Sequence, residues 1–407
     1  MRIGIDVRYL SHGLVGGVHT YVAHFVPALI DLARDHHIYL YADTKRPFEL
    51  ADLPAHVTVR YLTWKQPVSS VYHDFFMRRQ MARDGVEIAH FPANYGFGPR
   101  GARTIVTLHD ALTIMPLRST LHSSGTPMTL RRRAMIVYLY LCSQIALRQA
   151  SLVVTVSQHA RREIARYSRF DPNRIVSVPH APTPDLQRVE DSTRLAEVRR
   201  RHHLDKPFVL ADALKNPGVL VRAWPSLPET LRQRYEIVFF SRRPDPLPIV
   251  QTAVAAGHAR LLINPPREDL IALYSLAEIF VFPSWIEGFG IPLLEAMTCG
   301  APVIASNRSA IPEVVGDAGL IIDAEDDVAL AQHLTRLLSM PAEAQAWRER
   351  GFRRAAQFSW RHTAQRILDT YSLALNANGS IESKGNRTQT PAPTCDVCRR
   401  GVNVDEH

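Results

Sequence analysis

Residues 278–306 carry the pattern that most restricts how this chain can fold. The apolar run 278–283 predicts a buried strand, and residues 301–306 predict a second one. Between them, a Gly-Phe-Gly turn at 288–290 leads into a predicted helix that has Pro292 at its start. A strand, turn, helix and strand in this order form a βαβ unit. Its turn places free backbone N–H groups and a helix N-terminus at the carboxyl edge of the sheet, a position suited to anions.

Two glutamates flank this turn, Glu287 just before it and Glu295 about one turn inside the helix. An ionised carboxylate only accepts hydrogen bonds, so beside a phosphate it is expected to face hydroxyl donors. Sugar and ribose diols are such donors, and a nucleotide sugar carries hydroxyls on both sides of a diphosphate. The alternative is a helix-capping Glu287 and an ordinary surface Glu295. The agreement of strand, turn and helix around both acids favours the ligand site.

The string from Pro283 to Met297 resembles the Glu-x7-Glu motif of the family 4 retaining glycosyltransferases, which have the GT-B fold. The resemblance continues through residues 300–304, 311–319 and 358–360, and looser matches reach back to residue 1. It implies two Rossmann-like, doubly wound parallel-sheet domains that face a central cleft. It also implies that Glu287 contacts the donor sugar, that Glu295 contacts the ribose, and that the anomeric configuration is retained.

The length of the chain agrees with two domains. It has 407 residues, 46% of them hydrophobic, and no run of 18 apolar residues that would span a membrane. Its first residues read as a buried strand and not as a signal peptide. The four cysteines are too few and too unevenly placed for a disulfide framework, which fits a reducing cytoplasm.

The net charge of +9 lies in the first half of the chain. Residues 1–185 hold 22 Lys and Arg against 13 Asp and Glu, while the two classes balance in residues 186–407. A basic half suggests an anionic partner, and solubility in an arginine-rich proteome is an equal alternative.

Strands and helices alternate through the first half of the chain, which predicts a mostly parallel sheet. The expected strands are residues 2–7, 38–42, 57–62, 88–91, 104–108 and 152–156. The expected helices are residues 18–34, 75–84, 130–149 and 157–167.

The second half repeats the alternation, and a proline-rich stretch beginning near residue 178 separates the two. The expected organisation is an acceptor-side domain at 1–178, a linker at 179–205, a nucleotide-sugar-binding domain at 206–345, a C-terminal helix at 346–375 that returns to the first domain, and a disordered tail at 376–407. A single Cys-x-x-Cys in the tail is weak evidence for a metal.

Further site residues follow from position and from the resemblance. Gly16 and Gly17 come between the first strand and a helix, where the family has a similar turn near the acceptor and the leaving phosphate; a plain tight turn is the alternative. His109 follows the buried strand 104–108, and the family histidine in this setting contacts the donor sugar. Taken alone, His109 would read as a structural histidine.

Diphosphate binding is expected from Lys215 together with the turn. The backbone amides that would take the developing charge belong to Gly288, Phe289, Gly290 and Ile291. The sequence departs from the family here, because no arginine lies between Phe208 and Lys215. Arg242 and Arg243, after a later strand, are candidates to replace it. A second departure is Val-Pro-His-Ala at 178–181, where the family often has Pro-Asn-Gly.

Residues 130–141 join an arginine cluster to an apolar stretch. This segment could lie on an anionic membrane surface near a lipid-linked acceptor, or it could be a buried helix with a basic end. The second interpretation is slightly favoured.

These features together predict a metal-independent glycosyltransferase with no cofactor, with His109 and Glu287 as its catalytic residues. The C-terminal half is similar to bacterial glycosyltransferases of surface polysaccharide synthesis, and this resemblance implies a nucleotide-diphosphate sugar donor, GDP-mannose first and UDP-sugars as the alternative. It also implies, together with the basic N-terminal half, an acceptor that is lipid-linked or a polysaccharide. The enzyme is expected in the cytoplasm and at the inner face of the membrane. The competing interpretations are an epimerase, a catalytically inactive sugar-binding protein, and a nucleic-acid-binding protein, for which no motif is present.

Overall fold

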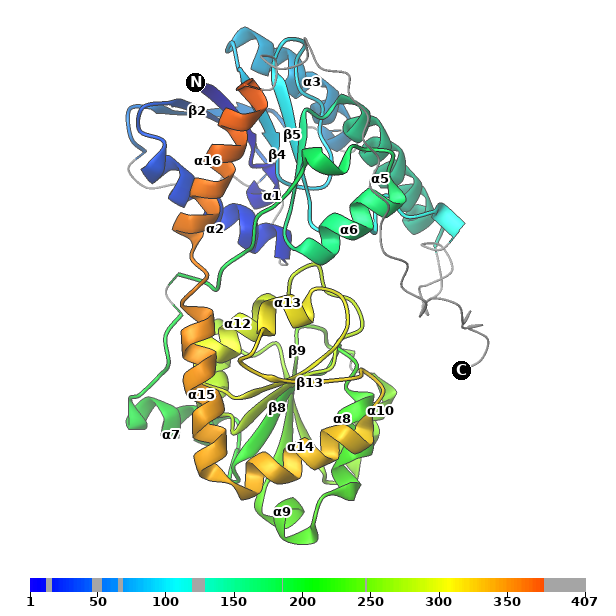
Figure 1. Ribbon diagram of the computed structural model, residues 1–407, viewed down its shortest axis with the longest axis vertical. Helices are drawn as coiled ribbons and strands as arrows, with labels where there is room; N and C mark the ends of the chain where they lie inside the picture. The colour runs from blue at the N-terminus through cyan, green and yellow to red at the C-terminus, as the bar shows by residue number, and fades with distance from the viewer. Residues whose placement is uncertain are drawn as a thin grey trace, which may run out of the picture.

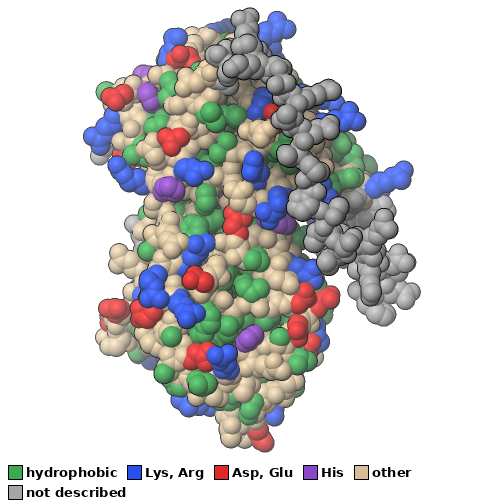
Figure 2. Space-filling model, viewed as in Figure 1, with side chains coloured by type: hydrophobic (Ala, Val, Ile, Leu, Met, Phe, Trp, Pro, Cys, Tyr) green, Lys and Arg blue, Asp and Glu red, His purple; other side chains and the backbone are tan. Residues whose placement is uncertain are grey.

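The computed structural model describes residues 1–11, 17–45, 53–64, 69–118, 129–184, 186–245 and 247–376. Two α/β domains lie one above the other, and the chain passes between them twice (Figure 1). Gly16 and the tail from 377 onward lie outside the described residues. Acidic and basic side chains are spread over both domains on the face that Figure 2 shows.

The N-terminal domain is built on a parallel sheet of seven strands in the order β3-β2-β1-β4-β5-β6-β7. Its strands are β1 (Arg2–Asp6), β2 (His37–Asp43), β3 (Val57–Leu62), β4 (Ile88–Phe91), β5 (Arg103–Leu108), β6 (Leu152–Thr155) and β7 (Ile175–Ser177). The six strands expected from the sequence are present within one residue at each end, and β7 was not anticipated. Its helices are α1 (Arg8–Ser11), α2 (Gly17–Leu32), α3 (Ser69–Arg83), α5 (Leu130–Gln149), α6 (Gln158–Tyr167) and the 3-10 turn η1 (Pro172–Arg174).

Apolar residues alternate between the two faces of this sheet, as the pleat requires. In β5, Ile105 packs beneath α2, while its neighbour Val106 packs beneath α5 and α6 on the opposite face. Both faces are therefore covered by helices, which is the usual arrangement for a fully parallel sheet.

The C-terminal domain is built on a parallel sheet of six strands in the order β10-β9-β8-β11-β12-β13. Its strands are β8 (Phe208–Asp212), β9 (Glu236–Ser241), β10 (Ala259–Ile263), β11 (Ile279–Phe282), β12 (Val303–Ser306) and β13 (Leu320–Ile322). Its helices are α8 (Gly218–Ala223), α9 (Glu229–Arg234), α10 (Pro248–Ala255), α11 (Arg267–Leu276), α12 (Ile291–Thr298), α13 (Ile311–Val315), α14 (Asp327–Ser339), α15 (Pro341–Ala355) and the 3-10 turn η2 (Trp224–Ser226). The predicted βαβ unit is β11-α12-β12.

Two segments differ from the expectation. The stretch expected as a linker contains a helix, α7 (Ser192–Arg201), whose Val198 is buried in the core of the C-terminal domain. The expected C-terminal helix is two helices, α15 and α16 (Trp360–Asn376), separated at Phe358 and Ser359.

Helix α16 belongs to the core of the N-terminal domain although it is last in the chain. Its residues Trp360, Ile367 and Tyr371 are buried with α2 and β1. The ring of His90 on β4 and the Tyr371 hydroxyl lie 2.7 Å apart, at hydrogen-bonding distance. Figure 1 shows α16 lying alongside α2. In both domains the strands end toward the same space between them, which is where ligands of such sheets bind.

Candidate active site

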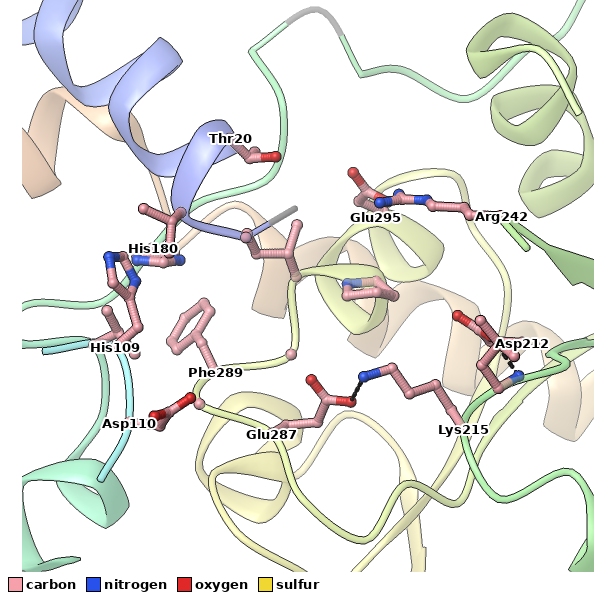
Figure 3. Close-up of a pocket in the computed structure, with 18 of the residues that line it drawn as sticks. Thr20, His109, Asp110, His180, Asp212, Lys215, Arg242, Glu287, Phe289 and Glu295 are labelled. Carbon is pink, nitrogen blue, oxygen red and sulfur yellow. Dashed lines mark hydrogen bonds and ion pairs between the residues drawn. The ribbon is translucent and has the colours of Figure 1, made fainter. Parts of the chain in front are cut away.

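A cavity of about 420 Å³ lies between the domains at the carboxyl ends of both sheets. Both domains contribute side chains, as Figure 3 shows. The residues lining it are Gly17, Val18, Thr20, His109, Asp110, Val156, His180, Asp212, Leu214, Lys215, Phe240, Arg242, Tyr274, Glu287, Gly288, Phe289, Gly290, Ile291, Pro292 and Glu295. All the residues predicted for the site line this cavity, except Gly16, which lies outside the described part of the chain.

The glycine turn between β11 and α12 forms the floor of the cavity. Gly290 has φ of 111°, a left-handed conformation that favours glycine, and it leads directly into α12. No side chain caps this helix; Pro292 has no N–H and the Leu293 N–H donates to the Gly290 carbonyl oxygen at 3.0 Å, so among the first three residues it is the Ile291 N–H that remains available at the cavity. Gly288 is needed for a different reason: a Cβ there would lie 2.5 Å from the His109 carbonyl oxygen of the other domain.

The carboxylate of Glu287 is held from one side. Its Oε1 lies 2.7 Å from the Lys215 ammonium and accepts a hydrogen bond of 2.8 Å from the Ser284 hydroxyl. Among the described residues, its Oε2 has no hydrogen-bond donor. The sequence predicted both Glu287 and Lys215 for the site but not the ion pair between them, which Figure 3 marks.

Glu295 is held in a similar way from its own side of the turn. Its side chain is on α12 and only 4% exposed, and its Oε1 lies 2.6 Å from the Arg267 guanidinium at the start of α11. Arg267 also donates to the Thr183 hydroxyl at 2.9 Å, so the segment that links the domains contacts the same cluster. Burial lowers the pKa of Arg267, but the hydrogen bond to Glu295 and the negative charge of Glu295, with smaller contributions from Tyr274 and Cys299, together outweigh it, and the net shift is upward. The cation therefore stays charged beside Glu295.

His109 follows β5 and reaches the cavity from the N-terminal domain. Its Nε2 lies 2.8 Å from the Pro92 carbonyl oxygen, which can only accept, so Nε2 carries the hydrogen and Nδ1 is left as an acceptor. Burial lowers the pKa of His109 to about 4. At neutral pH the ring is therefore uncharged.

Two carboxylates in the cavity, Asp110 and Asp212, were not among the predicted site residues. Burial raises the pKa of both side chains, and nearby Glu287 adds to the effect at each. Asp212 is the last residue of β8, and His109 directly follows β5, so both stand at the carboxyl end of a buried strand. The argument that placed His109 in the site from this position applies equally to Asp212.

The cationic side of the cavity contains Lys215 and Arg242, both in the C-terminal domain. Arg242 follows β9, is exposed, and has no ion pair within the described residues. Arg243, the other candidate to replace the missing arginine, does not line the cavity. No group of three or more His, Cys, Asp or Glu that could hold a metal occurs in the described part of the chain.

His180, where the sequence departs from the family pattern, is also part of the cavity wall. Its ring stacks on Tyr21 at 4.9 Å and meets Phe289 at 5.3 Å. Neither ring nitrogen has a hydrogen-bond partner in the described structure. Burial holds the pKa of His180 well below its usual range, so this ring too is neutral.

Sequence comparison places both halves in known families. Residues 15–185 match the family described as "Glycosyltransferase Family 4", and residues 210–354 match "Glycosyl transferases group 1". The O-antigen chain mannosyltransferase B of Escherichia coli is 32% identical over 324 residues, which are 76% of this chain and 81% of that protein. The serotype-specific mannosyltransferase WbdA of the same organism is 29% identical over 246 residues, 58% of this chain and 30% of that protein.

Solved structures share the fold at lower sequence identity. The sucrose-phosphate synthase of Thermosynechococcus elongatus superposes with a TM-score of 0.67 at 21% identity, over 92% of this chain and 99% of that one. Anabaena Alr3699/HepE in complex with UDP-glucose superposes with a TM-score of 0.64 at 16% identity, over 92% and 100% of the two chains. The matches to both halves, the similarity to the O-antigen enzyme and the architecture agree, and the chain belongs to the GT-B glycosyltransferases.

Proposed function

We propose that this glycosyltransferase transfers mannose from GDP-mannose to a hydroxyl group of a lipid-linked or polysaccharide acceptor, with retention of the anomeric configuration. The observation that carries the proposal is the pair Glu287 and Glu295 on either side of the amide-bearing turn in the interdomain cavity. The choice of mannose is supported by the similarity to the two E. coli mannosyltransferases.

The two carboxylates suit a ligand with hydroxyls at both ends of a diphosphate. Each has one oxygen already oriented by a cation, Lys215 for Glu287 and Arg267 for Glu295. Each has a second oxygen without a donor among the described residues. In the proposal, Glu287 accepts from the sugar hydroxyls and Glu295 from the ribose diol. Because the protein already fixes both side chains, little rotamer freedom is lost on binding.

The diphosphate lies between these acids in the proposed complex. Around that position lie the Ile291 N–H at the start of α12, the Lys215 ammonium and the Arg242 guanidinium. Arg242 supplies the second cation that the segment before Lys215 lacks. These groups stabilise the charge that develops on the leaving diphosphate, which is the main electrostatic requirement of the reaction.

His109 lines the sugar position from the other domain as a neutral ring with a free Nδ1 acceptor. The bond from the anomeric carbon to the phosphate oxygen breaks, and the acceptor oxygen bonds to the same face of that carbon. The acceptor proton then passes to the leaving phosphate oxygen, so no protein nucleophile is needed. A metal ion is likewise not part of the proposed reaction. Closure of the domains excludes water from the sugar position.

The acceptor is proposed to arrive at a membrane surface formed by residues 130–141 of α5. No helix in the described ranges is long and apolar enough to span a bilayer. On α5, Leu130 is 84% exposed, and Met135, Leu141 and the arginines at 131–133 are exposed as well. Residues 136–140 are half-buried and fully buried side chains begin only at Cys142, so the segment is less buried than the slightly favoured interpretation of a buried helix with a basic end expects. Basic and apolar side chains exposed together suit a cytoplasmic protein that binds anionic lipid headgroups.

Two other functions are supported by single observations. A UDP-sugar donor fits the fold shared with the Alr3699/HepE complex with UDP-glucose. A catalytically inactive sugar-binding protein fits the absence of an arginine before Lys215.

The experiment is a panel of GDP-, UDP- and ADP-sugars, scored for binding and for slow hydrolysis. Glu287→Gln and Glu295→Gln test the site, and Glu349→Gln on the exposed face of α15 is the matched control. We expect GDP-mannose to bind and to be hydrolysed, and both site variants to lose this activity. Hydrolysis of a UDP-sugar would select the first alternative, and binding without turnover would select the second. Folded protein that binds no nucleotide sugar would refute the proposal.

A further inference from the structure

The domains meet at a second place, away from the two chain crossings. There the N-terminus of α6, in the N-terminal domain, faces α13 in the C-terminal domain (Figure 1). The Glu313 carboxylate accepts from the backbone N–H of Gln158 at 2.8 and 2.9 Å, and from that of His159 at 3.2 Å. A side chain of one domain thus satisfies the unpaired amides at the start of a helix in the other.

Ser157, the residue before this helix, makes a second bond across the interface. Its hydroxyl oxygen accepts from the Ala160 N–H at 3.0 Å, which caps α6. The same hydroxyl donates to the Gly288 carbonyl oxygen at 2.9 Å. Gly288 belongs to the turn that follows Glu287, so the cap of α6 is bonded directly to the floor of the cavity. Ser157 is fully buried, which shields this bond from water.

The short helix that carries Glu313 is itself held in place. Arg354 at the end of α15 donates to the Glu313 carbonyl oxygen at 2.6 Å and to the Val314 carbonyl oxygen at 2.9 Å. The carboxylate is therefore presented to α6 from a rigid support. A negative charge at a helix N-terminus is also favoured by the helix dipole.

We propose that Ser157 and Glu313 are positioning residues that hold the domains closed and fix the glycine turn for the transfer reaction. Glu313 supplies the charged bond between the domains, and Ser157 transmits the closed position to Gly288 and so to Glu287. When the domains part, the amides of α6 and the Glu313 carboxylate each return to water. The inference rests on the proposed function for its effect on turnover, but the closure itself can be measured without turnover.

The test compares Glu313→Ala with Asp317→Asn. Asp317 is an exposed acid four residues further on that makes no bond to α6, so its variant controls for the loss of a nearby negative charge. Small-angle scattering of the full chain with GDP bound reports domain closure as the radius of gyration. GDP affinity is expected to stay within about twofold in both variants, because the proposed nucleotide contacts lie in the C-terminal domain.

We expect Glu313→Ala to raise the radius of gyration and to lower kcat for GDP-mannose hydrolysis about tenfold or more, as the loss of hydrogen bonds to a charged group implies. Asp317→Asn should match the wild type in both. Glu313→Gln, which can still accept from the amides, should recover part of kcat. An unchanged radius of gyration or an unchanged kcat in Glu313→Ala would overturn the proposal. If the wild type hydrolyses no donor, the proposed function fails, and the scattering comparison still decides whether Glu313 closes the domains.

Discussion

The close approach of Gly288 to the N-terminal domain predicts the effect of a single added methyl group. Gly288 is not among the glycines with positive φ, so Ala fits its backbone without strain. The obstacle is the His109 carbonyl oxygen, 2.5 Å from the position of the new Cβ, where ordinary contacts begin at 3.4 Å. The two domains must move apart by about 0.9 Å at this point to accept Gly288→Ala.

That movement breaks the bond between Ser157 and the turn. The hydroxyl lies 2.9 Å from the Gly288 carbonyl oxygen, and an added 0.9 Å takes it beyond hydrogen-bonding range. Overpacking and a lost buried hydrogen bond each cost about 1–3 kcal/mol. The lower limit of their sum, about 2 kcal/mol against the closed state, corresponds to a loss in kcat/KM of about thirtyfold, which is the smallest effect expected.

The assay is kcat/KM for GDP-mannose hydrolysis, with GDP affinity and the thermal midpoint measured beside it. GDP affinity and the midpoint should change little, because the clash arises only when the domains close. Gly351→Ala is the matched control: its Cβ would meet Met297 at 3.4–3.6 Å, an ordinary contact between α15 and α12. Full kcat/KM in Gly288→Ala would refute the reasoning, since it would mean that the turn and β5 need not meet for the reaction.

Three further predictions follow from the site and the surface. Lys215→Gln and Arg242→Gln should each weaken GDP binding about tenfold, as measured by calorimetry. If Arg242→Gln binds GDP as tightly as the wild type does, Arg242 is not part of the diphosphate site. The free energy of unfolding should fall as the pH drops. Burial lowers the pKa of His109 to about 4, against about 6.5 in the unfolded chain, so the unfolded state binds more protons between these two pH values. Up to about 3 kcal/mol of unfolding free energy is therefore lost between pH 6.5 and pH 4. Chemical denaturation across this pH range measures it, and a flat profile would contradict the buried neutral ring. Leu141→Glu should reduce binding to anionic vesicles severalfold without changing GDP affinity, and unchanged vesicle binding would exclude α5 from the membrane surface.

The strands of the first sheet could be predicted almost to the residue, because a strand buried on both faces is a short apolar run between turn residues. β5 and β6 show this directly. Helix α7 could not be predicted within the expected linker, because Val198 and Leu195 are its main apolar contacts. Two apolar positions are too few to show a helical period in the sequence. The break before α16 depends on Trp360 turning into the other domain, a tertiary effect that no local pattern records.

The sequence predicted some of the residues that line the cavity, but not Asp110 or Asp212, and not how the side chains are held. Glu287 and Glu295 were found from the spacing of one motif, whereas their partners come from elsewhere in the chain: Lys215 from the turn after β8 and Arg267 from the start of α11. His180 could only be noted as a departure from a family pattern, since its place beside Phe289 depends on how the domains pack. Contacts between the domains join residues more than a hundred positions apart in the sequence. The hydrophobic periodicity of a segment predicts its own helix or strand, but not its contacts with residues so far away.

The docking of α16 on β1 and α2 has a consequence for how the chain folds during synthesis. Residues 192–355, which include α7, form one continuous stretch, so the C-terminal domain can fold as soon as it has left the ribosome. The N-terminal domain, although made first, lacks the helix that carries Tyr371 until α16 has been synthesised. Until α16 is made, part of one apolar face of the N-terminal domain stays exposed to water. A fragment that ends near residue 180 is therefore expected to aggregate when it is expressed alone.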